Sequence, residues 1–144
     1  MDDINEWNFM GNNDTIHSPG TASNEQHGTH ITGIIPAVKD NGVGIAGIAP
    51  KAKIMPLKVF SNGQVYTIDL IEGINYAANG AKVVNCSWGT AEQNTALMET
   101  MKGSSMLFVC AVGNCRENID STPVYPASYS SSSTWDRNRK YIAK

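Results

Sequence analysis

The chain has 144 residues, of which 41% are apolar and 17% charged, so it suits one globular domain and not a disordered chain. A balance of 11 basic and 13 acidic residues gives a net charge of −2, which argues against binding to nucleic acid or to an anionic membrane surface. No apolar run approaches the roughly 20 residues of a membrane span, and the acidic N-terminus indicates no signal peptide.

The first half of the chain begins with a polar stretch, residues 1–26, that is predicted to be loop because turn-forming residues dominate it. A helix is predicted over 27–37, where apolar residues recur at helical spacing and Pro36 loosens the last turn. Residues 53–60 are predicted to form a strand, which Pro56 weakens because proline has no N–H to donate.

The second half continues the alternation of helix and strand. Helices are predicted at 67–79 and 91–102, and strands at 82–86 and 106–112, the first of them buried on both faces. This order predicts an α/β fold, a three-layer doubly wound parallel sheet with helices on both faces. Residues 130–144 are polar and are predicted to be disordered.

Chemistry in such sheets gathers beyond the carboxyl ends of the strands. The segment Ser87-Trp88-Gly89 follows one predicted strand and can pair with an extended peptide, or can be a simple turn. Gly113-Asn114 follows the next strand, where the amide can donate to a developing oxyanion or again form a turn. His27 opens a predicted helix, where it is either a rigidly held general base or a structural histidine.

Metal binding is not predicted from the histidines. His27 and His30 share one helix face, but the third ligand of a zinc site would have to be His17, which lies in a loop.

The cysteines, at positions 86, 110 and 115, have the spacing of neither a zinc knuckle nor a disulfide framework. The first two lie in apolar segments and are predicted to be buried free thiols.

Five segments gain meaning from their order along the chain. They read HGTHITGI (27–34), GIAGIAP (44–50), VVNCSWG (83–89), VGN (112–114) and YPA (125–127). In this order they closely resemble the subtilisin-like serine proteases, or subtilases, over about residues 1–129.

The resemblance implies a serine endopeptidase that cleaves extended polypeptide. It matches His27 to the triad histidine that acts as general base, and Asn114 to the side chain that donates to the oxyanion. Trp88 is bulkier than the aliphatic residue expected at its position. No cofactor is required, although calcium is common in the family near the segment that here contains Asp40 and Asn41. The substrate-binding residues implied are Ser87, Trp88, Gly89, Ala111 and Gly113.

The chain departs from the family at two triad positions. No apolar strand leads into an aspartate before His27, and no Gly-Thr-Ser-Met-Ala-Ala-Pro segment opens a buried helix. We therefore expect residues 1–129 to be a partial catalytic domain, truncated or frameshifted, that is inactive alone. The alternatives are a peptide-binding pseudoprotease and a non-functional gene fragment. Subtilases are usually extracellular, but the sequence leaves the location open.

Overall fold

The computed structural model describes residues 5–17 and 22–129, with the backbone alone for 22–25, so the predicted tail at 130–144 lies outside the described residues. The chain divides into two compact units after Gly73. Helices alternate with strands that pair in parallel, which confirms the predicted α/β class.

The first unit contains a short parallel pair, β1 (Trp7–Asn8) and β2 (Leu57–Lys58). The β1 strand lies inside the segment that was predicted to be loop, so that prediction is wrong here. The buried Asn8 side chain accepts from the Gly11 N–H at 3.0 Å and donates to the Thr15 carbonyl at 2.9 Å. These bonds satisfy its polar atoms and fold the chain back behind the strand.

The helix that carries His27 is α1 (Ala22–Ile34), which begins earlier than predicted. His27 consequently lies inside the helix and not in its first turn. Residues 26–30 are exposed, and Ile34 retains 51% of its accessible surface, so the described part of this helix is largely open to solvent. The helix ends at Ile34 and not at the predicted 37: the Ile35 N–H still donates to the Ile31 carbonyl at 3.1 Å, but Pro36 has no N–H to continue the pattern.

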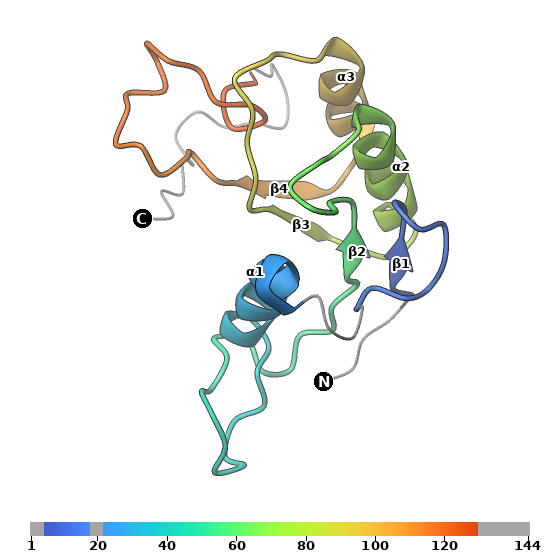
Figure 1. Cartoon of the computed structure of the whole chain (residues 1–144), viewed down its shortest axis with the longest axis vertical. Coiled ribbons are helices and arrows are strands. Elements are labelled where there is room, and N and C mark those ends of the chain that lie inside the picture. Colours follow the sequence, from blue (N-terminus) through green and yellow to red (C-terminus); the bar gives the residue numbers. More distant parts are fainter. Residues whose placement is uncertain (1–4, 18–21, 130–144) are drawn as a thin grey trace. The chain divides into compact units, whose positions relative to one another are not determined.

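A long loop follows α1 and protrudes beyond its end (Figure 1). The chain returns beside its outgoing path, where the N–H groups of Gly47 and Ala49 donate to the carbonyls of Ala37 and Ile35 at 2.9 and 2.8 Å. Gly47 is required there, since a Cβ atom would meet backbone atoms of residues 35–37.

The α2 helix (Thr67–Ala77) leads into the second unit, which is built on a β–α–β arrangement. Its strands β3 (Val83–Cys86) and β4 (Leu107–Cys110) pair in parallel, with Val83 opposite Leu107 and Cys86 opposite Cys110. They lie alongside one another in Figure 1. The buried apolar residues of this unit are Ile74, Ala77, Cys86, Leu97, Met101, Met106, Pro126 and Tyr129.

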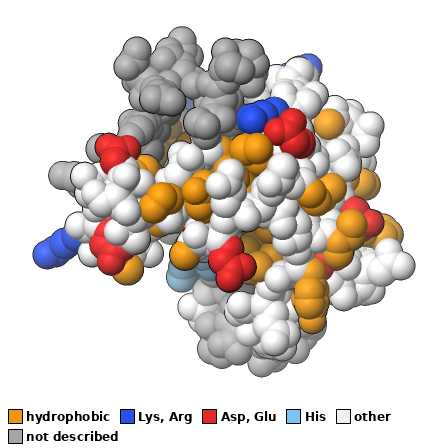
Figure 2. Space-filling view, turned by 90° about the horizontal axis from the view of Figure 1, so that it is seen from above, with side chains coloured by type: hydrophobic (Ala, Val, Ile, Leu, Met, Phe, Trp, Pro, Cys, Tyr) orange, Lys and Arg blue, Asp and Glu red, His pale blue; other side chains and the backbone are white. Residues whose placement is uncertain are grey.

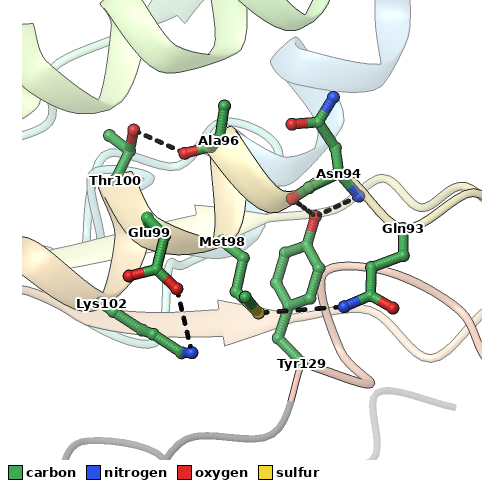
Figure 3. Close-up of polar contacts among 8 residues, drawn as sticks. All are labelled: Gln93, Asn94, Ala96, Met98, Glu99, Thr100, Lys102 and Tyr129. Carbon is green, nitrogen blue, oxygen red and sulfur yellow. Dashed lines mark hydrogen bonds and ion pairs between the residues drawn. The ribbon is translucent and has the colours of Figure 1, made fainter.

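The connecting helix, α3 (Thr95–Gly103), is amphipathic and well capped. Leu97 and Met101 are buried on its inner face, one turn apart. On the outer side Lys102 pairs with Glu99 at 3.3 Å, an interaction drawn in Figure 3. The Asn94 side chain accepts from the Leu97 N–H at 3.0 Å, so the helix begins at Thr95 and not at the predicted 91.

The predicted burial of β3 on both faces is wrong. Val83 and Asn85 are exposed while Cys86 is buried, so exposure alternates along the strand. Within the described chain, β3 has one strand partner and one covered face. Its apolar sequence therefore does not mean that both faces of the strand are buried. Figure 2 shows hydrophobic side chains reaching the surface between scattered charged ones.

Candidate functional site

A pocket of about 290 Å³ lies beyond the carboxyl ends of β3 and β4. It is lined by Ser87, Trp88, Gly89, Thr90, Ala91, Ala111, Gly113, Asn114 and Val124. None of these side chains is charged, so the pocket suits an uncharged group better than an ion. The two segments singled out from the sequence, after each of two neighbouring parallel strands, are thus brought to one place.

Hydrogen bonds hold the first wall of the pocket in position. The ladder continues past the strands, because the Ala111 N–H donates to the Cys86 carbonyl at 3.0 Å. The Asn85 side chain donates to the Ser87 hydroxyl oxygen at 2.7 Å. Asn85 was not predicted as a site residue, although its place two residues before Ser87 puts both side chains on the same face of an extended chain.

The opposite wall comes from residues that are distant in sequence. Thr90 and Tyr125 form an antiparallel bridge with N–H to carbonyl distances of 2.9 and 2.8 Å. The bridge brings Val124 to the pocket, and the Val124 N–H donates to the Ser128 hydroxyl at 3.0 Å. The Tyr125–Pro126 peptide bond is cis. The Tyr-Pro-Ala motif indicated that this segment matters, but the sequence did not predict that Tyr125 pairs with Thr90.

Two glycines have a specific steric role at the pocket. A Cβ atom on Gly89 would lie 2.6 Å from the Val124 Cγ1, so the two walls touch where Gly89 has no side chain. Gly113 has a φ of 90°, a backbone conformation that favours glycine. It turns the chain after β4 and presents the exposed Asn114 at the pocket lining.

His27 lies on α1 in the first unit and is exposed. His30, one turn later, is exposed as well. Helix positions three apart share a face, as the sequence predicted.

The loop considered for calcium uses its side-chain oxygens locally. Asp40 Oδ2 lies 3.5 Å from the Lys39 ammonium, and the Asn41 side-chain oxygen accepts from the Val43 N–H at 3.0 Å. This donor set does not fit a calcium ion, which takes six to eight oxygen ligands. Across residues 5–17 and 22–129, no three His, Cys, Asp or Glu side chains gather as metal ligands.

The described helices include none that is both long and apolar enough to cross a membrane.

Comparison with known proteins places these features in a family. The model of the subtilase family matches residues 1–138. The chain belongs to the subtilase family. Among individual subtilases, it is 38% identical to thermitase of Thermoactinomyces vulgaris over 134 residues, which are 88% of this chain and 44% of thermitase. It is 40% identical to the cell wall-associated protease of Bacillus subtilis (strain 168) over 126 residues, 84% of this chain and 13% of that protein.

Solved subtilase structures agree with the fold. The crystal structure of a cold-adapted subtilisin-like serine proteinase has a TM-score of 0.65 at 27% identity, covering 87% of this chain and 43% of that one. The S41 psychrophilic protease has a TM-score of 0.60 at 26% identity, covering 67% and 34%. The chain therefore has a partial α/β subtilisin fold and spans less than half the length of these subtilases.

Proposed function

We propose that the chain is part of a serine endopeptidase and that its pocket binds an extended polypeptide substrate. The observation that carries this proposal is the convergence of Ser87–Gly89 and Ala111–Asn114 on one uncharged pocket. Subtilases are serine peptidases, and the residues that converge are those whose motifs match the family. A protease family implies a polypeptide substrate, and no organic cofactor is needed for the chemistry.

The substrate would lie as an extra strand beside residues 87–89. Main-chain hydrogen bonds give such an arrangement affinity, and a pocket for an alternate side chain gives it selectivity. Trp88 lines that pocket together with Ala111 and Val124, so an uncharged side chain before the scissile bond is favoured.

Asn114 would stabilise the negative charge that develops on the carbonyl oxygen of the scissile bond. A side-chain amide can donate to that oxygen, and its place after the Gly113 turn brings it to the pocket lining. The loss of one such donor in a member of this family lowers turnover by roughly 10²–10³.

His27 would take the proton from the attacking serine hydroxyl. The 144 residues contain no segment that matches the family's serine or aspartate motif. The triad as a unit contributes about 10⁶ to turnover in a member of this family. We therefore propose that these residues bind peptide without hydrolysing it, and that hydrolysis requires the serine and aspartate segments from elsewhere.

The test uses the purified chain and two measurements. We expect no labelling by a fluorophosphonate probe, and labelling that one specific serine substitution abolishes would overturn the proposed inactivity. We expect a fluorescent extended peptide with uncharged side chains to bind, measured by anisotropy, and Trp88→Ala to weaken binding at least about tenfold. Tyr66→Ala is the matched control, since Tyr66 is an aromatic residue that is 58% exposed and does not line the pocket. Binding that Trp88→Ala leaves unchanged would contradict the assignment of the pocket.

A peptide-binding pseudoprotease is the second candidate. It is favoured by the fact that the pocket is formed by residues 87–124 within one compact unit. The nucleotide sequence on both sides of this reading frame distinguishes the two. An aspartate-bearing strand upstream and a serine-bearing helix downstream support the endopeptidase, and their absence supports the pseudoprotease.

A further inference from the structure

Two cysteines face each other at the ends of the strands that carry the pocket. Cys86 is the last residue of β3, Cys110 is the last residue of β4, and the two are register partners. Register partners on parallel strands direct their side chains to the same face of the sheet. The Cys110 side chain lies close enough to the Cys86 thiol to raise the pKa of that thiol. The proposed peptide chemistry uses neither of them.

We propose that Cys86 and Cys110 form a thiol–disulfide redox site, which a low-molecular-weight disulfide oxidises to an intramolecular disulfide bond. Neighbouring strands lie about 4.8 Å apart, and this spacing falls within the usual Cα separation of disulfide-bonded residues, roughly 4.4–6.8 Å. Both cysteines are thiols in the present structure, so it represents the reduced form of the site.

The two thiols differ in a way that sets the order of the reaction. Cys86 is only 2% exposed, whereas Cys110 is half-buried and more accessible. Its interaction with Cys110 raises the pKa of the Cys86 thiol, and burial raises it further, so Cys86 is the poorer of the two initial nucleophiles. Cys110 therefore supplies the attacking thiolate, and Cys86 resolves the intermediate.

In the first step the Cys110 thiolate attacks one sulfur of the small disulfide. The S–S bond of the oxidant breaks, and one thiolate leaves and takes up a proton, which gives a mixed disulfide on Cys110. The Cys86 sulfur then attacks the Cys110 sulfur, the S–S bond of the mixed disulfide breaks, and the second small thiolate leaves and takes up the proton that the Cys86 thiol gives up. The two cysteines lose two hydrogen atoms and two electrons in total, and the small disulfide is reduced to two thiols.

Two other roles for these thiols are a disulfide with Cys115 and the binding of a metal ion, and both fit the structure less well. Cys115 is exposed and lies beyond the Gly113 turn, outside the strand register. Within the described ranges no third His, Cys, Asp or Glu side chain joins Cys86 and Cys110 to form a metal-ligand cluster. A dithiol without further ligands is better suited to disulfide formation than to a structural zinc site.

The bond would join the two strands directly below the pocket. Cys86 precedes Ser87, Cys110 precedes Ala111, and the Ala111 N–H already donates to the Cys86 carbonyl. In the reduced form, hydrogen bonds hold the two strand ends together. Oxidation would add a covalent bond between them.

The experiment oxidises the purified full chain with oxidised glutathione in a Cys115→Ser background and maps the products by trypsin digestion and mass spectrometry. In this background cleavage after Lys82, Lys102 and Arg116 places Cys86 on peptide 83–102 and Cys110 on peptide 103–116. We expect the two peptides to be cross-linked, with a mass two hydrogen atoms below their sum. The cross-link should form at least roughly tenfold faster in native buffer than in guanidinium chloride, because the fold holds the thiols together.

Serine variants provide the matched controls. Adding Cys86→Ser or Cys110→Ser to the Cys115→Ser chain should abolish the cross-link, and only the variant that retains Cys110 should accumulate a glutathione adduct rapidly in native buffer. Glutathione adducts on Cys110 without a cross-link would overturn the proposal. Equal rates in native buffer and in denaturant would overturn it as well, and this comparison requires no change at either cysteine.

Discussion

The Tyr129 hydroxyl bonds to both backbone polar groups of Asn94. It accepts from the Asn94 N–H at 3.3 Å and donates to the Asn94 carbonyl at 3.0 Å (Figure 3). Asn94 is also the residue that caps α3. One phenol group therefore ties the segment that follows the cis proline to the start of the helix that connects β3 with β4. The Tyr125 ring, whose centroid lies 5.0 Å from that of Tyr129, packs against it.

Removing this hydroxyl should destabilise the chain. Tyr129→Phe leaves the ring in place but removes both hydrogen bonds of the hydroxyl, while the Asn94 carbonyl keeps the Met98 N–H at 3.0 Å, so we expect a cost of about 0.5–1.5 kcal/mol of unfolding free energy. Urea unfolding measures the loss. Tyr66→Phe, at a residue that is 58% exposed, should change stability by no more than about 0.5 kcal/mol. Equal effects of the two substitutions would show that the Asn94 contacts contribute nothing.

Stability should fall at alkaline pH. Burial raises the pKa of Tyr129 above 10.0, its ordinary value, while the hydrogen bond with the Asn94 backbone opposes the shift and Tyr125 adds to it. The folded state therefore binds the proton more tightly than the unfolded state. This contribution to stability is fully present below pH 10 and is lost as pH rises through the higher folded pKa. Cys86 adds a loss of the same sign that begins near 9.0, because its pKa is raised as well.

The two contributions can be separated by measuring melting temperature across the alkaline range. Tyr129→Phe should show a shallower fall than the parent chain above about pH 10, since phenylalanine does not ionise. Parallel curves for the two proteins would be inconsistent with a raised Tyr129 pKa.

Because Gly89 lies very close to Val124, we expect a substitution at Gly89 to lower stability and a second substitution at Val124 to restore it. A Cβ atom 2.6 Å from Val124 Cγ1 forces one wall of the pocket to move, so Gly89→Ala should cost about 1–3 kcal/mol and weaken peptide binding. Adding Val124→Ala removes the clashing methyl group and should recover most of the stability. Failure of the second substitution to recover any stability would locate the damage elsewhere than this contact.

Two glycines of the first unit should respond in opposite directions to the same change. Gly47→Ala places a methyl group 2.6 Å from the Ile35 carbonyl oxygen, which is backbone and cannot rotate away, so we expect a loss of at least about 1–3 kcal/mol. Gly33→Ala meets nothing within 4 Å on α1 and should gain roughly 0.5–1 kcal/mol from higher helix propensity. Thermal unfolding of both variants measures these changes in stability. A loss of stability in Gly33→Ala would contradict the second expectation.

The alternation of elements was predictable because apolar spacing is a local signal. The strand at 83–86 and the helix at 67–77 lie within the predicted ranges. The strand predicted at 53–60 is only Leu57–Lys58 in the structure (β2). It begins directly after Pro56, the residue that weakened the prediction. β1 escaped prediction because two residues carry no periodicity, and its pairing with β2 depends on a partner far along the chain.

The pocket likewise combines residues that local sequence pattern predicts with residues that depend on contacts between distant segments. Its Ser87–Gly89 and Ala111–Asn114 walls were predictable, because both follow strands that local pattern identified. Thr90, Ala91 and Val124 were missed. Val124 reaches the pocket only through the Thr90–Tyr125 bridge, and the sequence pattern of either segment alone does not specify that pairing.

The parallel pair of β3 and β4 also has a consequence for engineering. All the residues that line the pocket fall between Ser87 and Val124, and the strands, the helix and the bridge that position them belong to the same compact unit. The selectivity that we propose for this pocket would therefore be encoded in one short, contiguous piece of the gene. On that proposal, exchanging the piece as a single cassette between related proteins should transfer the preference while the segment that carries His27 is left untouched.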